Sequence, residues 1–446
     1  PPATAIIDII ASARRLSVRS DIIPNGHWDA APAIITRETK VAICGVSIPM
    51  RAAYTAPRPQ KPPIASPDSN AALHATGAAV QRRRQDSPSV EPMTGWGSLV
   101  ATTGISAAVI RMAVNANKRN LTLDLKNPAA VEIVKKLVLD ADVVMENFRP
   151  GVMDRLGIGY DDLSKINPRL IYCGVSGFGR EGPQKNAPSY DGKIQALSGV
   201  MSITGHEGDG PLRAGFAVCD ALTGMTAAFA VSSAIFQRTH TGKGQLVDVA
   251  MFDSTLSFLS PTVVDYTVAG HQQRQFGNQA ISRKPTANLF KVKNGYLLLA
   301  VNNEGQYIRL AKTLNRPELY EDARFKDWPS RIENETAMRE IIEDALSTND
   351  AQSWEKILEE GGAPCASVRT IDEAVAHPQL EYRDVLQTVE GPKGPMTMIG
   401  SGFKLAHGGG SIDRPPPTIG EHTDEILAAA GYSEAEIAKF RADKVL

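Results

Sequence analysis

Asp220 is the residue of this chain whose type and setting best suit a nucleophile. It follows a nearly apolar run at residues 214–219 and starts a predicted helix over residues 220–238 that is rich in Ala, Gly and Ser. A carboxylate at a helix start, partly desolvated by apolar neighbours, can attack an acyl carbon. The same position suits an N-cap, whose carboxylate accepts the free N–H groups of the first turn. The local pattern leaves both roles open.

Three other patterns give weaker support for chemistry. Residues 177–182 match G-x-G-x-x-G, but Pro183 and a polar run follow where a dinucleotide fingerprint needs a helix, so a loop is predicted. Residues 407–410 resemble a lipase oxyanion loop, yet the chain has no Gly-x-Ser-x-Gly elbow, which favours a glycine turn. The eight histidines form no closely spaced pair. No metal site is therefore expected.

Composition excludes some classes of partner. The chain has 446 residues, with 48 Lys+Arg against 49 Asp+Glu. A nucleic-acid binder normally carries a basic excess, so none is expected here. No apolar run reaches the roughly 18 residues of a membrane span. The four cysteines lie far apart, which favours a reducing compartment and a cytoplasmic location. Arg14, Arg15 and Arg19 among serines faintly resemble a mitochondrial presequence, which is the alternative.

The elements that position Asp220 form an α/β pattern. Asn127 and Pro128 predict a helix start, and strands are predicted at residues 142–145, 170–175 and 246–252, with a short helix at 160–166. Strand, helix, strand with short connections is typical of a parallel sheet covered by helices. The sequence therefore predicts an α/β fold for the middle of the chain.

The remaining segments suggest the domain organisation. Residues 1–95 are proline-rich, with one predicted strand at 40–46 and a basic arm at Arg82, Arg83 and Arg84. A strand at 295–301 and helices at 306–313, 335–346 and 352–360 indicate a further unit, and a last helix begins near Thr423. We predict an atypical segment over 1–95, a large domain from 96–250 with 385–446, and linkers with a small domain over 251–384.

From about residue 117 onward the chain resembles the family III CoA-transferases, the group that includes formyl-CoA transferase and carnitine CoA-transferase. The resemblance covers roughly three quarters of the chain, and it rests on the joint order of several motifs. These are NKRNLTLDLK at 117–126, ENFRPG at 146–151 with RLG at 155–157, YD at 190–191 with QALSG at 195–199, Asp220 with TG at 223–224, TGKGQ at 241–245, and RPPP at 414–417 with GEHT at 420–423.

The resemblance implies a role for each matching residue. Asp220 falls on the catalytic aspartate of the family, Arg155 on a basic residue facing the CoA phosphates, and Tyr190 and Asp191 on the loop that lines the thioester end. The segments that hold CoA match Leu123, Asp124, Leu125, Lys126, Asn147 and Phe148. Lys126 and Arg155 would pair with phosphate charge.

The resemblance also implies a fold and a reaction. The expected fold is a Rossmann-like large domain with a smaller α+β domain, in an interlocked homodimer. CoA would pass from an acyl-CoA thioester to a free carboxylic acid through an aspartyl anhydride and an enzyme-CoA thioester. Coenzyme A is then a substrate, and no cofactor is expected. Backbone N–H groups of Gly277 and Asn278 are candidates for stabilising the oxyanion. Arg274, Arg283 and Lys284 either pair with a carboxylate of a dicarboxylic acid or lie on the surface.

Two alternatives remain from the sequence. The related 2-methylacyl-CoA racemases carry a histidine just before the aspartate at position 191, where this chain has Tyr190. Tyrosine is a poor base at neutral pH, which favours a transferase. Residues 1–95 lack the strand, glycine turn and helix with which the family begins. A catalytically impaired CoA-binding protein is therefore the other alternative.

Overall fold

The computed structural model of the chain describes residues 5–9, 33–34, 40–43, 46–49, 112–408 and 410–446. The arginine-rich stretches at residues 14–19 and 82–84 lie outside these described residues. The chain divides into two compact units. Unit 1 comprises residues 1–145, 163–170 and 387–446, and unit 2 comprises residues 146–162 and 171–386. The domain boundaries inferred from the sequence stay a prediction.

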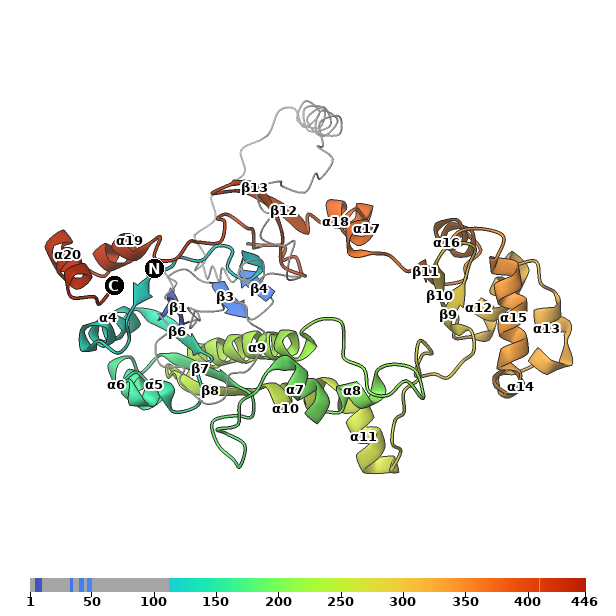
Figure 1. The fold of residues 1–446 in the computed structure, drawn as a ribbon, viewed down its shortest axis with the longest axis horizontal. Helices are drawn as coiled ribbons and strands as arrows, with labels where there is room; N and C mark the ends of the chain where they lie inside the picture. Colours follow the sequence, from blue (N-terminus) through green and yellow to red (C-terminus); the bar gives the residue numbers. More distant parts are fainter. Residues whose placement is uncertain (1–4, 10–32, 35–39, 44–45, 50–111, 409) are drawn as a thin grey trace, which may run out of the picture. The chain divides into compact units, whose positions relative to one another are not determined.

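The described elements mix helices with several small sheets (Figure 1). Up to residue 170 they are β1 Ala5–Ile9, β2 Ala33–Ile34, β3 Lys40–Ile43, β4 Val46–Pro49, β5 Thr122–Leu123, α4 Pro128–Val138, β6 Ala141–Glu146, α5 Val152–Arg155 and α6 Tyr160–Ile166. Residues 171–300 form β7 Ile171–Ser176, α7 Asp191–Leu197, α8 Val200–Ile203, α9 Val218–Thr241, β8 Gln245–Ala250, α10 Met251–Phe258, α11 Ser260–Ala269, β9 Ala287–Lys291 and β10 Tyr296–Ala300.

The remaining elements are mostly short helices. They are α12 Glu304–Thr313, α13 Glu318–Glu321, the 3-10 helix η1 Ala323–Phe325, α14 Trp328–Glu333, α15 Glu335–Leu346, α16 Ala351–Glu360, β11 Cys365–Ser367, α17 Ile371–Val375, α18 Pro378–Tyr382, β12 Leu386–Gly391, β13 Gly394–Ile399, α19 Thr423–Ala429 and α20 Glu434–Ala442. The α/β class predicted from the sequence is confirmed by this mixture.

Strands β6, β7 and β8 are the three strands predicted in the middle of the chain. Strands β7 and β8 run parallel, with Ile171 opposite Gln245 and Ser176 opposite Ala250. Two segments of the sequence prediction are corrected. Residues 40–46 do not form one strand, because β3 and β4 pair antiparallel there. The strand predicted to reach residue 252 ends at Ala250, where the backbone turns directly into α10.

Helix α9 lies along the parallel pair β7 and β8 (Figure 1). Its buried face is made of small residues, including Gly224, Ala227 and Ala228, which let neighbouring backbone approach closely. The helix ends at Gly242, whose φ of 71° is the left-handed conformation that favours glycine. Among the described helices, α9 is long and apolar enough to cross a membrane, a test that the core helix of a soluble protein also passes.

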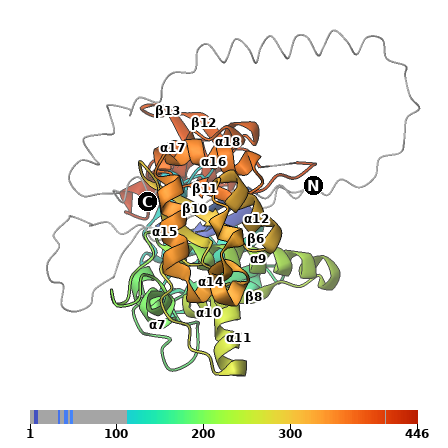
Figure 2. The same ribbon diagram turned by 90° about the vertical axis from the view of Figure 1, so that its right-hand side faces the viewer.

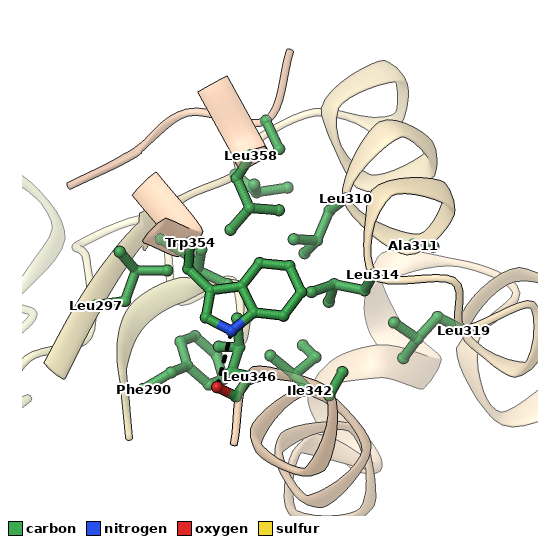
Figure 3. Packing of buried hydrophobic residues seen from close by; sticks show 14 of the residues in the cluster. Phe290, Leu297, Leu310, Ala311, Leu314, Leu319, Ile342, Leu346, Trp354 and Leu358 are labelled. Carbon is green, nitrogen blue, oxygen red and sulfur yellow. Dashed lines mark hydrogen bonds between the residues drawn. The ribbon is translucent and has the colours of Figure 1, made fainter. Parts of the chain in front are cut away.

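Unit 2 also contains a three-stranded antiparallel sheet with the strand order β11-β10-β9. Helices α12, α15 and α16 gather around these strands (Figure 2). Trp354 lies in the resulting core, and its indole N–H donates to the Leu346 carbonyl at 2.8 Å (Figure 3). That bond satisfies the one polar atom of the indole ring, so the large ring can be buried without an unpaired donor.

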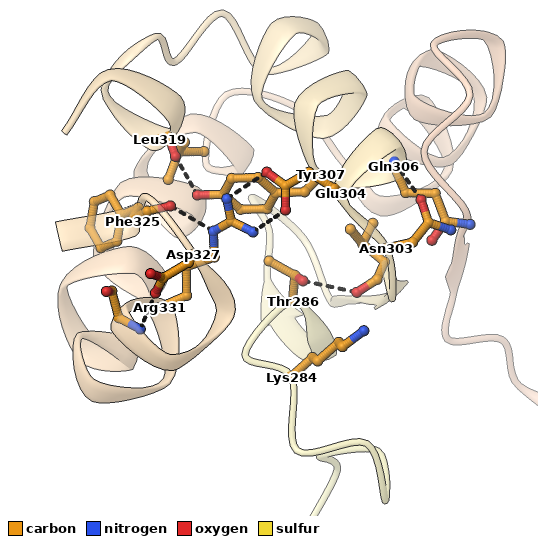
Figure 4. Close-up of polar contacts among 12 residues, drawn as sticks. Lys284, Thr286, Asn303, Glu304, Gln306, Tyr307, Leu319, Phe325, Asp327 and Arg331 are labelled. Atoms are coloured by element: carbon orange, nitrogen blue, oxygen red, sulfur yellow. Dashed lines mark hydrogen bonds and ion pairs between the residues drawn. The ribbon is translucent and has the colours of Figure 1, made fainter. Parts of the chain in front are cut away.

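Arg331 on α14 is the largest fully buried side chain of the described residues. Its guanidinium donates to both Glu304 carboxylate oxygens at 2.6 and 2.7 Å, and to the Phe325 carbonyl at 2.7 Å (Figure 4). The guanidinium carbon lies 3.7 Å from the centre of the Tyr307 ring. Because every face of the group has a partner, this buried charge ties α12, η1 and α14 together.

Two distant motifs meet within unit 1. The Asn117 carboxamide donates to the Ser411 carbonyl at 2.8 Å, and its oxygen accepts from the Asp413 and Arg414 N–H groups at 2.7 and 2.8 Å. The Asn120 carboxamide oxygen accepts from the Gly420 N–H at 2.6 Å. Two asparagines near residue 120 thus hold the segment that leads into α19.

Candidate active site

Asp220 lies in the first turn of α9, and it does not cap the helix. The N-cap is Ala217, three residues earlier, and it makes no side-chain hydrogen bond. The N-cap role considered from the sequence is therefore wrong, because the helix already begins at Val218. The Asp220 carboxylate is half-buried and accepts no hydrogen bond from another described residue. It remains available to an incoming group.

The neighbouring carboxylate of Asp191 performs the capping instead. Its Oδ1 accepts from the backbone N–H groups of Cys219 at 2.8 Å and Asp220 at 3.4 Å. Its Oδ2 accepts from the Gln195 carboxamide at 2.6 Å, and the oxygen of that carboxamide accepts from the Ala214 N–H at 3.0 Å. A buried carboxylate at the start of α7 therefore fixes both the start of α9 and the segment before it.

Burial and this second carboxylate together raise the pKa of Asp220 to about 6. Burial is the larger cause, because it disfavours the charged form, and the negative charge of Asp191 acts in the same direction. An aspartate with such a pKa is more basic than an exposed one and is still ionised at neutral pH. Both properties suit a carboxylate nucleophile.

The change Asp191→Asn tests this electrostatic coupling. An asparagine keeps an oxygen for the Cys219 N–H but loses the negative charge, so the pKa of Asp220 falls. A carboxylate attacks only in its ionised form, so a nucleophilic role for Asp220 predicts that the acid limb of the kcat/KM profile moves from about pH 6 to lower pH. An acid limb that stays in place or moves to higher pH contradicts the coupling.

Tyr190 stands beside this carboxylate pair at the N-cap of α7, and its side chain is 67 % exposed. Under the pair, Ile194, Cys219 and Met251 form a small buried cluster. The structure thus brings together Tyr190, Asp191 and Asp220, as the family resemblance implies. The loop predicted at residues 177–182 is confirmed, because no helix begins at its glycines.

Asn147 and Phe148 lie in the turn that follows β6, and buried charges hold this turn. The Phe148 N–H donates to the buried Glu146 carboxylate at 2.7 Å. Arg180, from the loop after β7, reaches Glu146 at 3.8 Å and Asp154 at 3.2 Å. Burial raises the pKa of Glu146 and outweighs the Phe148 N–H and Arg180, which lower it, so the net result is a rise to about 7. Neither Glu146 nor Arg180 was expected to hold the turn.

Arg155 ends the short helix α5, and its side chain is exposed next to Gly151. A Cβ on Gly151 would lie 3.3 Å from Nη1 of Arg155, and Gly151 has a φ of 82°. Leu123, Asp124, Leu125 and Lys126 belong to unit 1, where the two leucines are buried and the two charged side chains are exposed. The CoA-binding role of these residues stays a prediction.

The loop of Gly277 and Asn278 has one of its two candidate donors already engaged. The Gly277 N–H donates to the Gly205 carbonyl at 2.9 Å, and its φ of 58° favours glycine. A Cβ there would lie 2.3 Å from the His206 ring. Asn278 and His206 line a cavity of about 520 Å³, and Asp220 is not among the residues that line it. An oxyanion role for this loop stays a prediction for the Asn278 N–H.

Within the described ranges, no group of three or more His, Cys, Asp or Glu side chains could hold a metal ion. Comparisons with known proteins bear on the family of the chain. The sequence model of CoA-transferase family III matches residues 76–423. The chain belongs to CoA-transferase family III.

Similar proteins carry consistent names. An acyl-CoA transferase of Fusarium pseudograminearum is 34 % identical over 337 residues, which cover 75 % of this chain and 74 % of that protein. The succinyl-CoA:glutarate CoA-transferase of Mus musculus is 31 % identical over 337 residues, covering 75 % and 77 %. The acetyl-CoA:oxalate CoA-transferase of Acetobacter aceti is 37 % identical over 274 residues, covering 61 % and 70 %.

A solved structure agrees with this assignment. A CAIB/BAIF family protein from Brucella suis matches with a TM-score of 0.67 and 31 % identity, covering 73 % of this chain and 84 % of that one. The family and the transferase activity expected from the motifs are thereby confirmed. The family model also matches residues 76–116, which precede Asn117 and carry none of the motifs named above.

Proposed function

We propose that this family III CoA-transferase moves CoA between carboxylic acids through covalent intermediates on Asp220. The observation that carries the proposal is the half-buried Asp220 carboxylate at the start of α9, free of protein hydrogen bonds among the described residues and raised in pKa beside Asp191. Such a group is ionised, poorly solvated and open to an acyl carbon.

The proposed reaction begins with attack of an Asp220 carboxylate oxygen on the thioester carbon of the donor. The C–S bond breaks, CoA leaves as a thiolate, and a mixed anhydride remains on Asp220. The thiolate then attacks the Asp220 carbonyl carbon, and the donor acid leaves as a carboxylate. The acceptor carboxylate reverses both steps and departs as its CoA thioester. Each intermediate is an activated acyl group, so the sequence needs no other source of energy.

Contacts in the candidate site support different roles for its residues, some positioning Asp220 and others binding CoA. The Asp191 carboxylate fixes the start of α9, and therefore the backbone that carries Asp220. Asn147 and Phe148, held by Glu146, and the exposed Arg155 and Lys126 would bind CoA through backbone and phosphate contacts. The relatives named for glutarate and oxalate act on dicarboxylic acids, and we propose dicarboxylic substrates for this chain as well.

We also propose a homodimer. The exposed face of α9 carries three large apolar side chains, Met225, Phe229 and Phe236, at 48 %, 76 % and 68 % exposure. A face of this kind is costly to leave in water, and a second copy of the chain would cover it.

Trapping of the covalent intermediate tests the proposal. The protein is incubated with succinyl-CoA, acetyl-CoA and a 2-methylacyl-CoA, treated with hydroxylamine or borohydride, and mapped by peptide mass spectrometry. We expect the modification on the peptide that contains Asp220. Exchange of the Cα proton of the 2-methylacyl ester without any adduct would instead support a racemase. Binding of CoA without adduct or exchange would leave a CoA-binding protein.

A further inference from the structure

Arg213 reaches the carboxylate network of the proposed nucleophile from the segment between α8 and α9. Its Nη2 lies 3.6 Å from Oδ2 of Asp191, the residue that caps the helix of Asp220. The Arg213 side chain is 62 % exposed, whereas Asp191 is buried. The guanidinium therefore stands on the solvent side of the two carboxylates.

The contact with Asp191 leaves the guanidinium with unused donors. Both oxygens of Asp191 already accept closer hydrogen bonds, from Cys219, Asp220 and Gln195. A separation of 3.6 Å is longer than a hydrogen bond, and a guanidinium offers five N–H donors in a planar fork. The guanidinium N–H groups of Arg213 donate no hydrogen bond to another described residue. Its charge is held near the nucleophile, but its hydrogen-bonding capacity is not used.

Gly192 makes the room in which this guanidinium lies. A Cβ on Gly192 would be 3.0 Å from both Cζ and Nη2 of Arg213. That separation is tighter than an ordinary contact, so a larger residue at 192 would push the guanidinium away. The backbone of α7 therefore positions Arg213 as well as Asp191.

The three cations that the sequence suggested for binding a substrate carboxylate have other partners in the structure. Arg274 lies 3.6 Å from the Glu207 carboxylate, and Arg283 stacks on the Phe276 ring, 4.0 Å from its centre. The Lys284 ammonium donates to a backbone carbonyl and lies over an indole ring. In the part of the chain that the structure describes, none of the three pairs with Asp191 or Asp220.

We propose that Arg213 determines substrate class by binding the second carboxylate of a dicarboxylic acyl group or acid whose first carboxyl carbon reacts at Asp220. The inference rests on the function proposed above and names the residue that recognises its dicarboxylic substrates. A planar fork binds a carboxylate through two parallel hydrogen bonds, which a methyl group in the same place cannot form. Recognition would thus favour a succinyl over a butyryl group.

The experiment compares two CoA esters that differ in one terminal group. Initial rates are measured with succinyl-CoA and with butyryl-CoA as donors, for the wild type and for Arg213→Ala. We expect kcat/KM for succinyl-CoA to fall by about 10- to 100-fold, as for loss of a hydrogen bond to a charged group. The value for butyryl-CoA should change by less than about threefold, since its methyl group does not use the fork.

Three variants serve as controls. Arg274→Ala removes a surface arginine of the same type and should leave the ratio of the two kcat/KM values unchanged. Arg213→Lys keeps a charge without the fork and should recover part of the lost selectivity. Gly192→Ala should lower the same ratio while leaving Arg213 in the sequence, because it displaces the guanidinium.

The outcomes separate this inference from the proposed function. Equal losses with both esters would show that Arg213 supports the fold of the site, and unchanged kcat/KM values for both esters would show that it does not recognise substrate; either overturns the inference. In both cases a wild type that still forms the Asp220 adduct keeps the proposed function. A wild type that transfers CoA from neither ester and forms no adduct overturns the proposed function and the inference with it.

Discussion

Asp220→Asn is expected to lower the rate of CoA transfer by at least about 10³-fold. Asparagine keeps the size of the side chain, and the backbone N–H of residue 220 still reaches Asp191. The amide, however, is neutral and is not a nucleophile, so neither the anhydride nor the enzyme-bound thioester can form. Binding of the acyl-CoA should persist because the residues that would bind it are unchanged.

The measurement combines initial rates with a titration of CoA ester binding by calorimetry. Asp253→Asn is the matched control, since Asp253 is an exposed aspartate in the first turn of α10. The control should transfer CoA at the wild-type rate. If Asp220→Asn retains more than about one tenth of the wild-type rate, the carboxylate of residue 220 is not the nucleophile.

Arg331→Ala is expected to lower the free energy of unfolding by about 3 kcal/mol. The arginine side chain is 2 % exposed, and its removal leaves the buried Phe325 carbonyl without a donor and the Tyr307 ring without its stacked cation. Glu304 is more exposed, and water can solvate its carboxylate after the change. The lost stability therefore comes mainly from the buried partners, the Phe325 carbonyl and the Tyr307 ring.

Urea unfolding followed by circular dichroism measures this difference. Arg324→Ala is the control, because Arg324 pairs with Asp322 at 2.7 Å but both side chains lie toward solvent. Its midpoint should match that of the wild type, as expected for a surface ion pair. Equal shifts for the two variants would mean that the buried contacts of Arg331 do not stabilise the fold.

The sequence predicted the elements best where local signals agreed. Helices at residues 160–166 and 335–346 have the predicted bounds, and the Asn127 side chain caps α4 with Pro128 at its first position. Asn127 and Pro128 act within a few residues, so no distant contact is needed to recognise them. The strand predicted over residues 40–46 was too long, because β3 ends at Ile43 and the separate strand β4 begins at Val46, and their antiparallel pairing leaves no local signal in an apolar run.

The candidate site was predicted in part. The family resemblance assigned Asp220, Tyr190 and Asp191 to one site, whereas the alternative N-cap role for Asp220 was wrong. The cap comes from Asp191, 28 residues away, through a tertiary contact that local patterns do not encode. Gln195 stands four residues after Asp191, a spacing that puts both on one helix face and could have indicated their pairing. No local spacing in the sequence indicates that Arg213 lies near Asp191.

The long-range contacts of Asn117 and Arg119 limit when unit 1 can fold during synthesis. Asn117 binds Ser411 across 294 residues, and Arg119 pairs with Glu425 across 306. A ribosome delivers the first partner of each pair long before the second. Unit 1 can therefore close only after residues 411–425 have been made, through a slow search between distant segments. Until then, water must satisfy the polar groups of the 117–120 segment.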